Sequence, residues 1–114
     1  MRYLQKLTFV RQKAAEHEPG INEKIYWSFH AINKLRIERL RKAHVEAALK
    51  DAVLIEDYQD HGRSLPDCLL LGFIEDNPVH IVAAIDIEID RIFIITVYRP
   101  DIMRWENDWK RRKK

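Results

Sequence analysis

Apolar residues in the first half of the chain recur with the spacing of α-helices. This periodicity predicts a helix over residues 2–17. Its expected buried face carries four apolar side chains: Leu4, Leu7, Val10 and Ala14. The Glu-Pro-Gly run at 18–20 ends this helix, because proline cannot continue it and glycine favours a turn.

Two more helices are expected after this break. The first is predicted over 22–35, where an asparagine can act as N-cap and Ile25, Phe29 and Ile32 fall on one face. A shorter helix is predicted over 42–50. The first half of the chain is therefore expected to be helical.

The second half changes to nearly continuous apolar runs separated by short polar turns. These runs predict strands at 52–58, 68–74, 79–86 and 91–98. Short connectors favour antiparallel neighbours, because parallel strands need crossovers of about a dozen or more residues. The sequence thus predicts an α+β fold, with N-terminal helices packed on a four-stranded antiparallel sheet. Two strands are apolar on both faces, so another segment is expected to shield part of the second face.

The residues after the last strand combine tryptophans with cations. Trp105 and Trp109 lie one turn apart in a predicted C-terminal helix, and their rings are expected to dock it onto the domain. Five cations follow at 110–114. They are expected to stay in water near the end of the last strand, where they can attract phosphates or simply form a solvated tail.

Length and composition narrow the class of protein. The 114 residues are typical of one domain, which we expect over 21–114 with an N-terminal helical extension at 1–20. The single cysteine, Cys68, excludes a disulfide within the chain and favours a cytoplasmic location. No apolar stretch reaches the roughly 20 residues of a membrane span. The net charge of +2 does not by itself indicate a nucleic-acid partner.

Five side chains are candidates for acid–base or phosphate-binding chemistry. They lie at strand ends, on a helix and in a turn: Tyr98, Arg99, His80, His30 and Arg63. RNA cleavage without a metal needs a group that takes the 2′-hydroxyl proton, a cation at the phosphate and a proton for the leaving oxygen. Each candidate also has a structural interpretation, as a half-buried aromatic, a local hydrogen-bond partner or a surface cation.

The spacing of these residues adds detail. Tyr98 and Arg99 point to opposite faces while the strand continues, and Pro100 ends its pairing there. His30 lies one helical turn from both Tyr26 and Lys34, so these three are expected to form one stripe of a helix. The chain lacks the motifs of zinc hydrolases and phosphate-binding loops, so no metal or cofactor is expected.

Ordered motifs between residues 29 and 105 resemble one known family. They read "FHAINKLRIERLRKAHVEAALKDAVLIEDYQDHGR", then "LLLGFIEDNPVHIVAAI", then "IFIITVYRP....W". This series is similar to the family catalogued as domain of unknown function 4258. That family usually has glycine where the first helix of the series ends, and Arg39 stands at this position here.

The resemblance implies a fold and a function. Members of the family are similar to small bacterial toxins of the RelE-like group, in which helices pack on a short antiparallel sheet. The implied function is a metal-independent endoribonuclease, the toxin of a toxin–antitoxin pair, whose antitoxin carries a zinc-finger or DNA-binding domain. The alternative is a degenerate relative or a non-catalytic protein-binding module. In the enzyme at least three of the five candidates converge in one concave site, whereas in the alternative they scatter.

Overall fold

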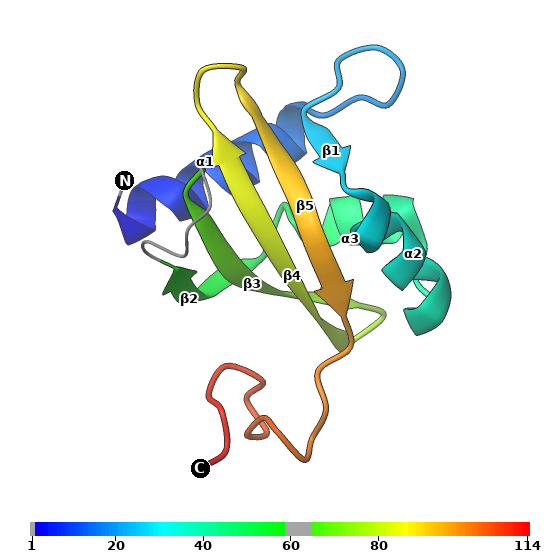
Figure 1. Ribbon diagram of the computed structural model, residues 1–114, viewed down its shortest axis with the longest axis vertical. Coiled ribbons are helices and arrows are strands. Elements are labelled where there is room, and N and C mark those ends of the chain that lie inside the picture. Colours follow the sequence, from blue (N-terminus) through cyan, green and yellow to red (C-terminus); the bar gives the residue numbers. More distant parts are fainter. Residues whose placement is uncertain (1, 59–64) are drawn as a thin grey trace.

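The computed structural model of the protein describes residues 2–58 and 65–114. Within them, helices and strands follow one another in the order α1 (Tyr3–Glu16), β1 (Ile25–Trp27), α2 (Phe29–Glu38), α3 (Lys42–Ala48), β2 (Val53–Tyr58), β3 (Asp67–Ile74), β4 (Asn77–Asp86) and β5 (Arg91–Tyr98). Figure 1 shows the helices gathered beside and behind a twisted sheet. None of these helices is both long and apolar enough to cross a bilayer.

The strands form one mixed sheet in the order β1-β5-β4-β3-β2. Strands β2 to β5 pair antiparallel with their neighbours in sequence, as their short connectors predict. Strand β1 joins the edge of β5 in parallel (Figure 1). The prediction of a four-stranded, purely antiparallel sheet is therefore wrong, because three residues assigned to a helix form a fifth strand.

The predicted helix over 22–35 begins only at Phe29. Ser28 is its N-cap and accepts a hydrogen bond from the backbone N–H of Ala31 at 3.0 Å. The run just before Ser28 is β-branched and aromatic, which favours a strand. Ile25 is buried, as expected, but it belongs to β1. Its spacing from the apolar residues of α2 matches a helical period by chance, which is why the predicted helix began too early.

The expected buried face of this helix is also wrong. Phe29 is 97% exposed and Ile32 is 43% exposed. Helix α2 instead buries Ala31 and Leu35. Its other apolar side chains face solvent: Phe29, Ile32 and Ile37.

Helix α1 agrees with its predicted range but buries cations that the periodicity missed. Leu4 is 68% exposed, whereas Lys6 is 1% exposed. The Lys6 ammonium pairs with the carboxylate of Asp57 and donates to the backbone oxygens of Tyr58 at 3.2 Å and Asp67 at 3.0 Å. A buried ammonium loses its hydrating water, and hydrogen bonds to these acceptors compensate for that loss.

Two further side chains of α1 donate to backbone oxygens at the edge strand β2. The hydroxyl of Tyr3 lies 3.2 Å from the oxygen of Leu54, and Nε of Arg11 lies 2.8 Å from the oxygen of Ala52. Together with Lys6, they attach the N-terminal part of α1 to β2, whereas the rest of the helix crosses the sheet towards β4 and β5. We call these three donors the edge clasp.

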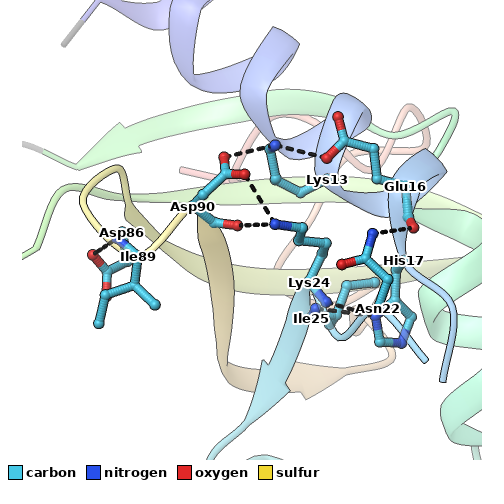
Figure 2. Close-up of polar contacts among 9 residues, drawn as sticks. All are labelled: Lys13, Glu16, His17, Asn22, Lys24, Ile25, Asp86, Ile89 and Asp90. Carbon is cyan, nitrogen blue, oxygen red and sulfur yellow. Dashed lines mark hydrogen bonds and ion pairs between the residues drawn. The ribbon is translucent and has the colours of Figure 1, made fainter. Parts of the chain in front are cut away.

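The C-terminal end of α1 is tied to the opposite side of the sheet (Figure 2). Asp90, in the β4–β5 turn, accepts from Lys13 at 2.7 Å and from Lys24 at 2.9 Å. The two ammonium groups lower the pKa of the Asp90 carboxyl. Nδ1 of His17 accepts the backbone N–H of Lys24 at 2.9 Å and that of Ile25 at 3.2 Å, which positions the start of β1.

Helix α3 and its C-cap residue bury Val45, Ala48 and Leu49. It packs very close to β3 at Gly72, where an added Cβ would lie 3.1 Å from the Cβ of Ala48. A larger residue at this position would push α3 away from the sheet. The close approach completes the core on the helical face.

Residues 99–114 cover part of the other face of the sheet, as the doubly apolar strands predict. Trp105 is 2% exposed and packs with two buried residues of the sheet, Leu69 and Val82. The predicted C-terminal helix is wrong, because this segment is built of turns. The Asp108 carboxylate accepts the backbone N–H of Lys110 at 2.9 Å, which satisfies the backbone without a helix.

Candidate functional site

His80 lies at the centre of the layer between the sheet and the C-terminal segment. It is fully buried on β4, and both ring nitrogens have partners. Nε2 lies 2.7 Å from the backbone oxygen of Trp109, and Nδ1 lies 3.2 Å from the hydroxyl of Tyr98. Because a carbonyl oxygen only accepts, Nε2 carries the proton and Nδ1 accepts from the phenol. Burial lowers the pKa of His80, so the imidazole is neutral at pH 7.

This arrangement follows from strand register and from a turn. His80 and Tyr98 are directly opposite each other on β4 and β5. The ring of Trp105 meets the imidazole edge-on, with centroids 4.4 Å apart and planes at 90°. Trp109 adopts a φ of 62°, a left-handed conformation that is unusual for a residue with a side chain. The turn brings its carbonyl to His80.

A second polar group borders this layer. Arg112 donates two parallel hydrogen bonds to the Glu56 carboxylate, at 2.8 and 3.0 Å, and its guanidinium lies 4.6 Å from the Trp105 ring centroid. Tyr58 donates its hydroxyl to the same carboxylate at 2.8 Å. The hydrogen bonds from Arg112 lower the pKa of Glu56, so it is ionised at neutral pH. Burial, followed by the Glu56 carboxylate, raises the pKa of Tyr58.

A cleft of about 460 Å³ opens between α2, the end of β5 and the C-terminal segment. The described residues that line it are Lys34, Glu38, Tyr98, Arg99, Asp101, Arg104, Trp105 and Arg112. Four of these side chains are cationic and two are acidic. The cleft is therefore positively charged, with the Tyr98 phenol on its wall and His80 bonded behind it. Burial raises the pKa of Tyr98, so the phenol keeps its proton at neutral pH.

Arg99 lines this cleft but also holds the end of α2. The guanidinium of Arg99 donates to the backbone oxygens of Glu38 at 3.0 Å and Arg39 at 3.3 Å. The backbone N–H of Arg99 donates to the Glu38 carboxylate. These contacts satisfy the free carbonyls at a helix C-terminus and complement its dipole. Arg39 adopts a φ of 56°, the conformation that glycine favours. The helix therefore ends where the resemblance places a glycine, even though arginine stands there.

The other candidates lie elsewhere. His30 is exposed and its Nε2 lies 3.0 Å from Oγ1 of Thr96, beside the cleft but not among its lining residues. The expected stripe with Tyr26 does not form, because Tyr26 belongs to β1; only Lys34 reaches the cleft. Arg63 lies outside the described residues. Thus Tyr98 and Arg99 line one concave site, and His80 contacts Tyr98 from behind.

The sequence interpretation missed Glu56 and Arg112. Glu56 and Tyr58 are two residues apart on a strand, and their polar groups at the end of an apolar run were a detectable signal. Arg112 offered no such signal, because it reaches Glu56 only when the chain folds back. Within the described part of the chain, no three His, Cys, Asp or Glu side chains are grouped so that they could hold a metal ion.

The profile of one protein family matches residues 27–99, which include α2, α3 and strands β2 to β5, and only the last residue of β1. Helix α1 and the C-terminal segment lie outside this match. Neither a curated protein nor a solved structure matches the chain. Since the match covers more than half of the sequence, the chain belongs to the family described as "Domain of unknown function (DUF4258)".

Proposed function

We propose that this protein is an endoribonuclease that cleaves RNA by acid–base chemistry in the positively charged cleft. One observation carries the proposal: the phenol of Tyr98 stands on the wall of a cationic cleft and donates its proton towards a buried, neutral imidazole. A phenol in this position can relay a proton from the substrate to His80.

The relay balances as follows. The 2′-hydroxyl of the substrate gives its proton to the Tyr98 oxygen, while the phenolic proton moves to Nδ1 of His80. The 2′-oxygen bonds to phosphorus, the bond from phosphorus to the 5′-oxygen breaks, and that oxygen takes a proton from water. The hydroxide that remains takes the added proton back from His80 through Tyr98, which restores both side chains. The products are a 2′,3′-cyclic phosphate and a 5′-hydroxyl. The Trp109 carbonyl and the nearby Glu56 carboxylate stabilise the imidazolium that forms.

Cations along the cleft supply the second requirement, stabilisation of the charged phosphate. Arg112 is held in a fixed orientation by Glu56 and by the face of Trp105. A planar guanidinium suits two phosphate oxygens at once. Arg104 is exposed and Lys34 is partly exposed on the same cleft, so both can reach a bound phosphate.

The test is cleavage of a labelled single-stranded RNA by the purified protein in the presence of a chelator. We expect products with 2′,3′-cyclic phosphate ends. Tyr98→Phe removes only the relay oxygen and should slow cleavage by about 10²–10⁴-fold. Tyr3→Phe makes the same chemical change on α1 and should leave the rate unchanged. No cleavage by the intact protein, or equal rates for Tyr98→Phe and the intact protein, would refute the proposal.

The biological role that we propose is the RelE-like toxin of a toxin–antitoxin pair, partnered by an antitoxin with a zinc-finger or DNA-binding domain. This role rests on the resemblance of the family and on the cleft. Induced expression in a bacterial host should arrest growth, and Tyr98→Phe should relieve the arrest at equal protein level. Harmless expression of the intact chain without any antitoxin would contradict the role.

A second candidate function, a non-catalytic protein-binding module, is supported by one groove. It measures about 380 Å³ between α3 and the β3–β4 turn, with Phe73 52% exposed on its wall. Asp51 and Glu75 also line it, so it would suit a partner segment with an apolar side chain next to a lysine or arginine. If this function holds, the intact protein should not cleave RNA, and Phe73→Ser should abolish capture of a peptide that carries an apolar side chain next to a lysine; unchanged capture would contradict this function.

A further inference from the structure

Two aromatic residues lie on neighbouring strands, on the sheet face that the C-terminal segment partly covers. Tyr26 of β1 and Phe93 of β5 are register partners in the parallel pair. Their neighbours Ile25 and Ile92 are buried in the core beneath the helices. Because side chains alternate along a strand, Tyr26 and Phe93 point to the other face.

This aromatic pair is accessible at its surface. Tyr26 is 37% exposed, and Phe93 is partly exposed. On its other side Phe93 pairs with Ala84 of β4, whose methyl group is too small to cover a phenyl ring. The guanidinium of Arg91 lies 4.5 Å from the centroid of the Tyr26 ring, with Asp86 3.4 Å from its Nε. The surface therefore combines two partly exposed aromatic residues with a guanidinium over the ring of one of them.

The aromatic pair is continuous with the cleft. Both Phe93 and Tyr98 belong to β5, and five residues of strand place them roughly 15 Å apart. Between them lies Thr96, whose hydroxyl forms a hydrogen bond with the exposed imidazole of His30. Figure 1 shows that α2, which carries His30 and Lys34, continues below β1 along the same side of β5.

We infer that the Tyr26–Phe93 pair is a stacking site for a base of single-stranded RNA whose backbone enters the cationic cleft. The inference deepens the proposed function and rests on it for the identity of the ligand. Rings and arginine planes are the surfaces on which unpaired RNA bases stack, and a base within a duplex is not free to do so. The few nucleotides between the two sites then pass over His30, whose imidazole offers a further ring. The substrate class is therefore single-stranded RNA.

The test separates binding from cleavage. The probe is a fluorescein-labelled single-stranded RNA with 2′-O-methyl groups at every position, which cannot be cut by attack of the 2′-oxygen. Tyr26→Leu and Phe93→Leu each keep an apolar side chain and remove a ring. Each should weaken binding, measured by fluorescence anisotropy, by roughly 5- to 150-fold, the cost of one lost stacking contact. Affinity for the duplex form of the same probe should not change.

Phe73→Leu is the matched control, since Phe73 is an exposed phenylalanine on β3 at the separate apolar groove. It should bind the single strand like the intact protein, and thermal melts should show that all variants are folded. Binding that depends on neither Tyr26 nor Phe93, or an equal loss for duplex and single strand, overturns the inference even if the protein cleaves RNA. Ring-dependent binding by a protein that does not cleave RNA supports the inference and refutes the proposed activity.

Discussion

Replacing Lys6 with methionine tests the role of the buried ammonium in α1. Methionine keeps most of the length and apolar volume of the lysine stem, so the change removes charge and donors and leaves packing nearly intact. The ammonium is 1% exposed, pairs with the Asp57 carboxylate and donates to two backbone oxygens. These acceptors belong to β2 and to its neighbour β3, so one ammonium of α1 serves both strands.

The expected loss of stability arises because Lys6→Met leaves the Asp57 carboxylate and two backbone oxygens without their ammonium donor. Removing one partner of a buried ion pair typically costs about 3–5 kcal/mol, because the remaining charge and carbonyls are less well solvated than in the unfolded chain. We therefore expect the free energy of unfolding of Lys6→Met to fall by about 3–5 kcal/mol. This would be a large part of the stability of a domain of this size.

Urea unfolding followed by tryptophan fluorescence measures this loss, because Trp105 is buried in the folded protein. Gln12→Met is the control: it places the same side chain on an exposed position of α1 and should change stability by no more than about 0.5 kcal/mol. A loss below about 1 kcal/mol for Lys6→Met would refute the reasoning, since exposed salt bridges already contribute that much.

Three further predictions concern the end of α2, the buried imidazole and the cleft. Arg39→Gly should raise the free energy of unfolding in urea by up to about 1 kcal/mol, because glycine adopts the left-handed conformation without strain; Arg36→Gly, inside the helix, should lower it by about the same amount. The pKa of His80 is lower in the folded protein than in the unfolded chain, so the unfolded chain binds the extra proton first as the pH falls. Stability should therefore be fully present above about pH 6.5 and decline below it by at most about 1.4 kcal/mol per pH unit, and His80→Gln should remove this slope from urea unfolding curves. Arg112→Gln should weaken single-stranded RNA binding and reduce the slope of log K against log salt by about 0.7, whereas an unchanged slope would exclude Arg112 from phosphate binding.

The strands could be predicted from the sequence because their signal is local. Apolar runs with short polar connectors determine both their positions and their antiparallel order. The fifth strand could not be predicted in this way, since Ile25–Trp27 is too short to show a period and its partner β5 lies far along the chain. The same limit applies to Lys6, whose burial depends on acceptors that only the folded sheet brings to α1.

The candidate site was predictable to the same extent. Tyr98 and His80 stand at strand ends whose antiparallel order was expected, and the register pairs them directly. The charge of Arg99 makes it a candidate in the sequence, but its guanidinium donates to the carbonyls at the end of α2, a contact between residues distant in sequence. Arg112 reaches the site through irregular turns, and turns without a repeating pattern leave no periodic trace in a sequence.

The edge clasp bears on how the chain behaves among other molecules. An uncovered edge strand exposes unpaired backbone groups to which a strand of another molecule can add, which leads to swapped dimers or fibres. At β2 the side chains of Tyr3, Lys6 and Arg11 already occupy backbone oxygens along that edge. Helix α1 lies outside the region matched by the family. A chain without such a helix would leave these backbone oxygens free to accept hydrogen bonds from a strand of another molecule. We therefore expect α1 to limit the addition of a strand from another molecule at β2.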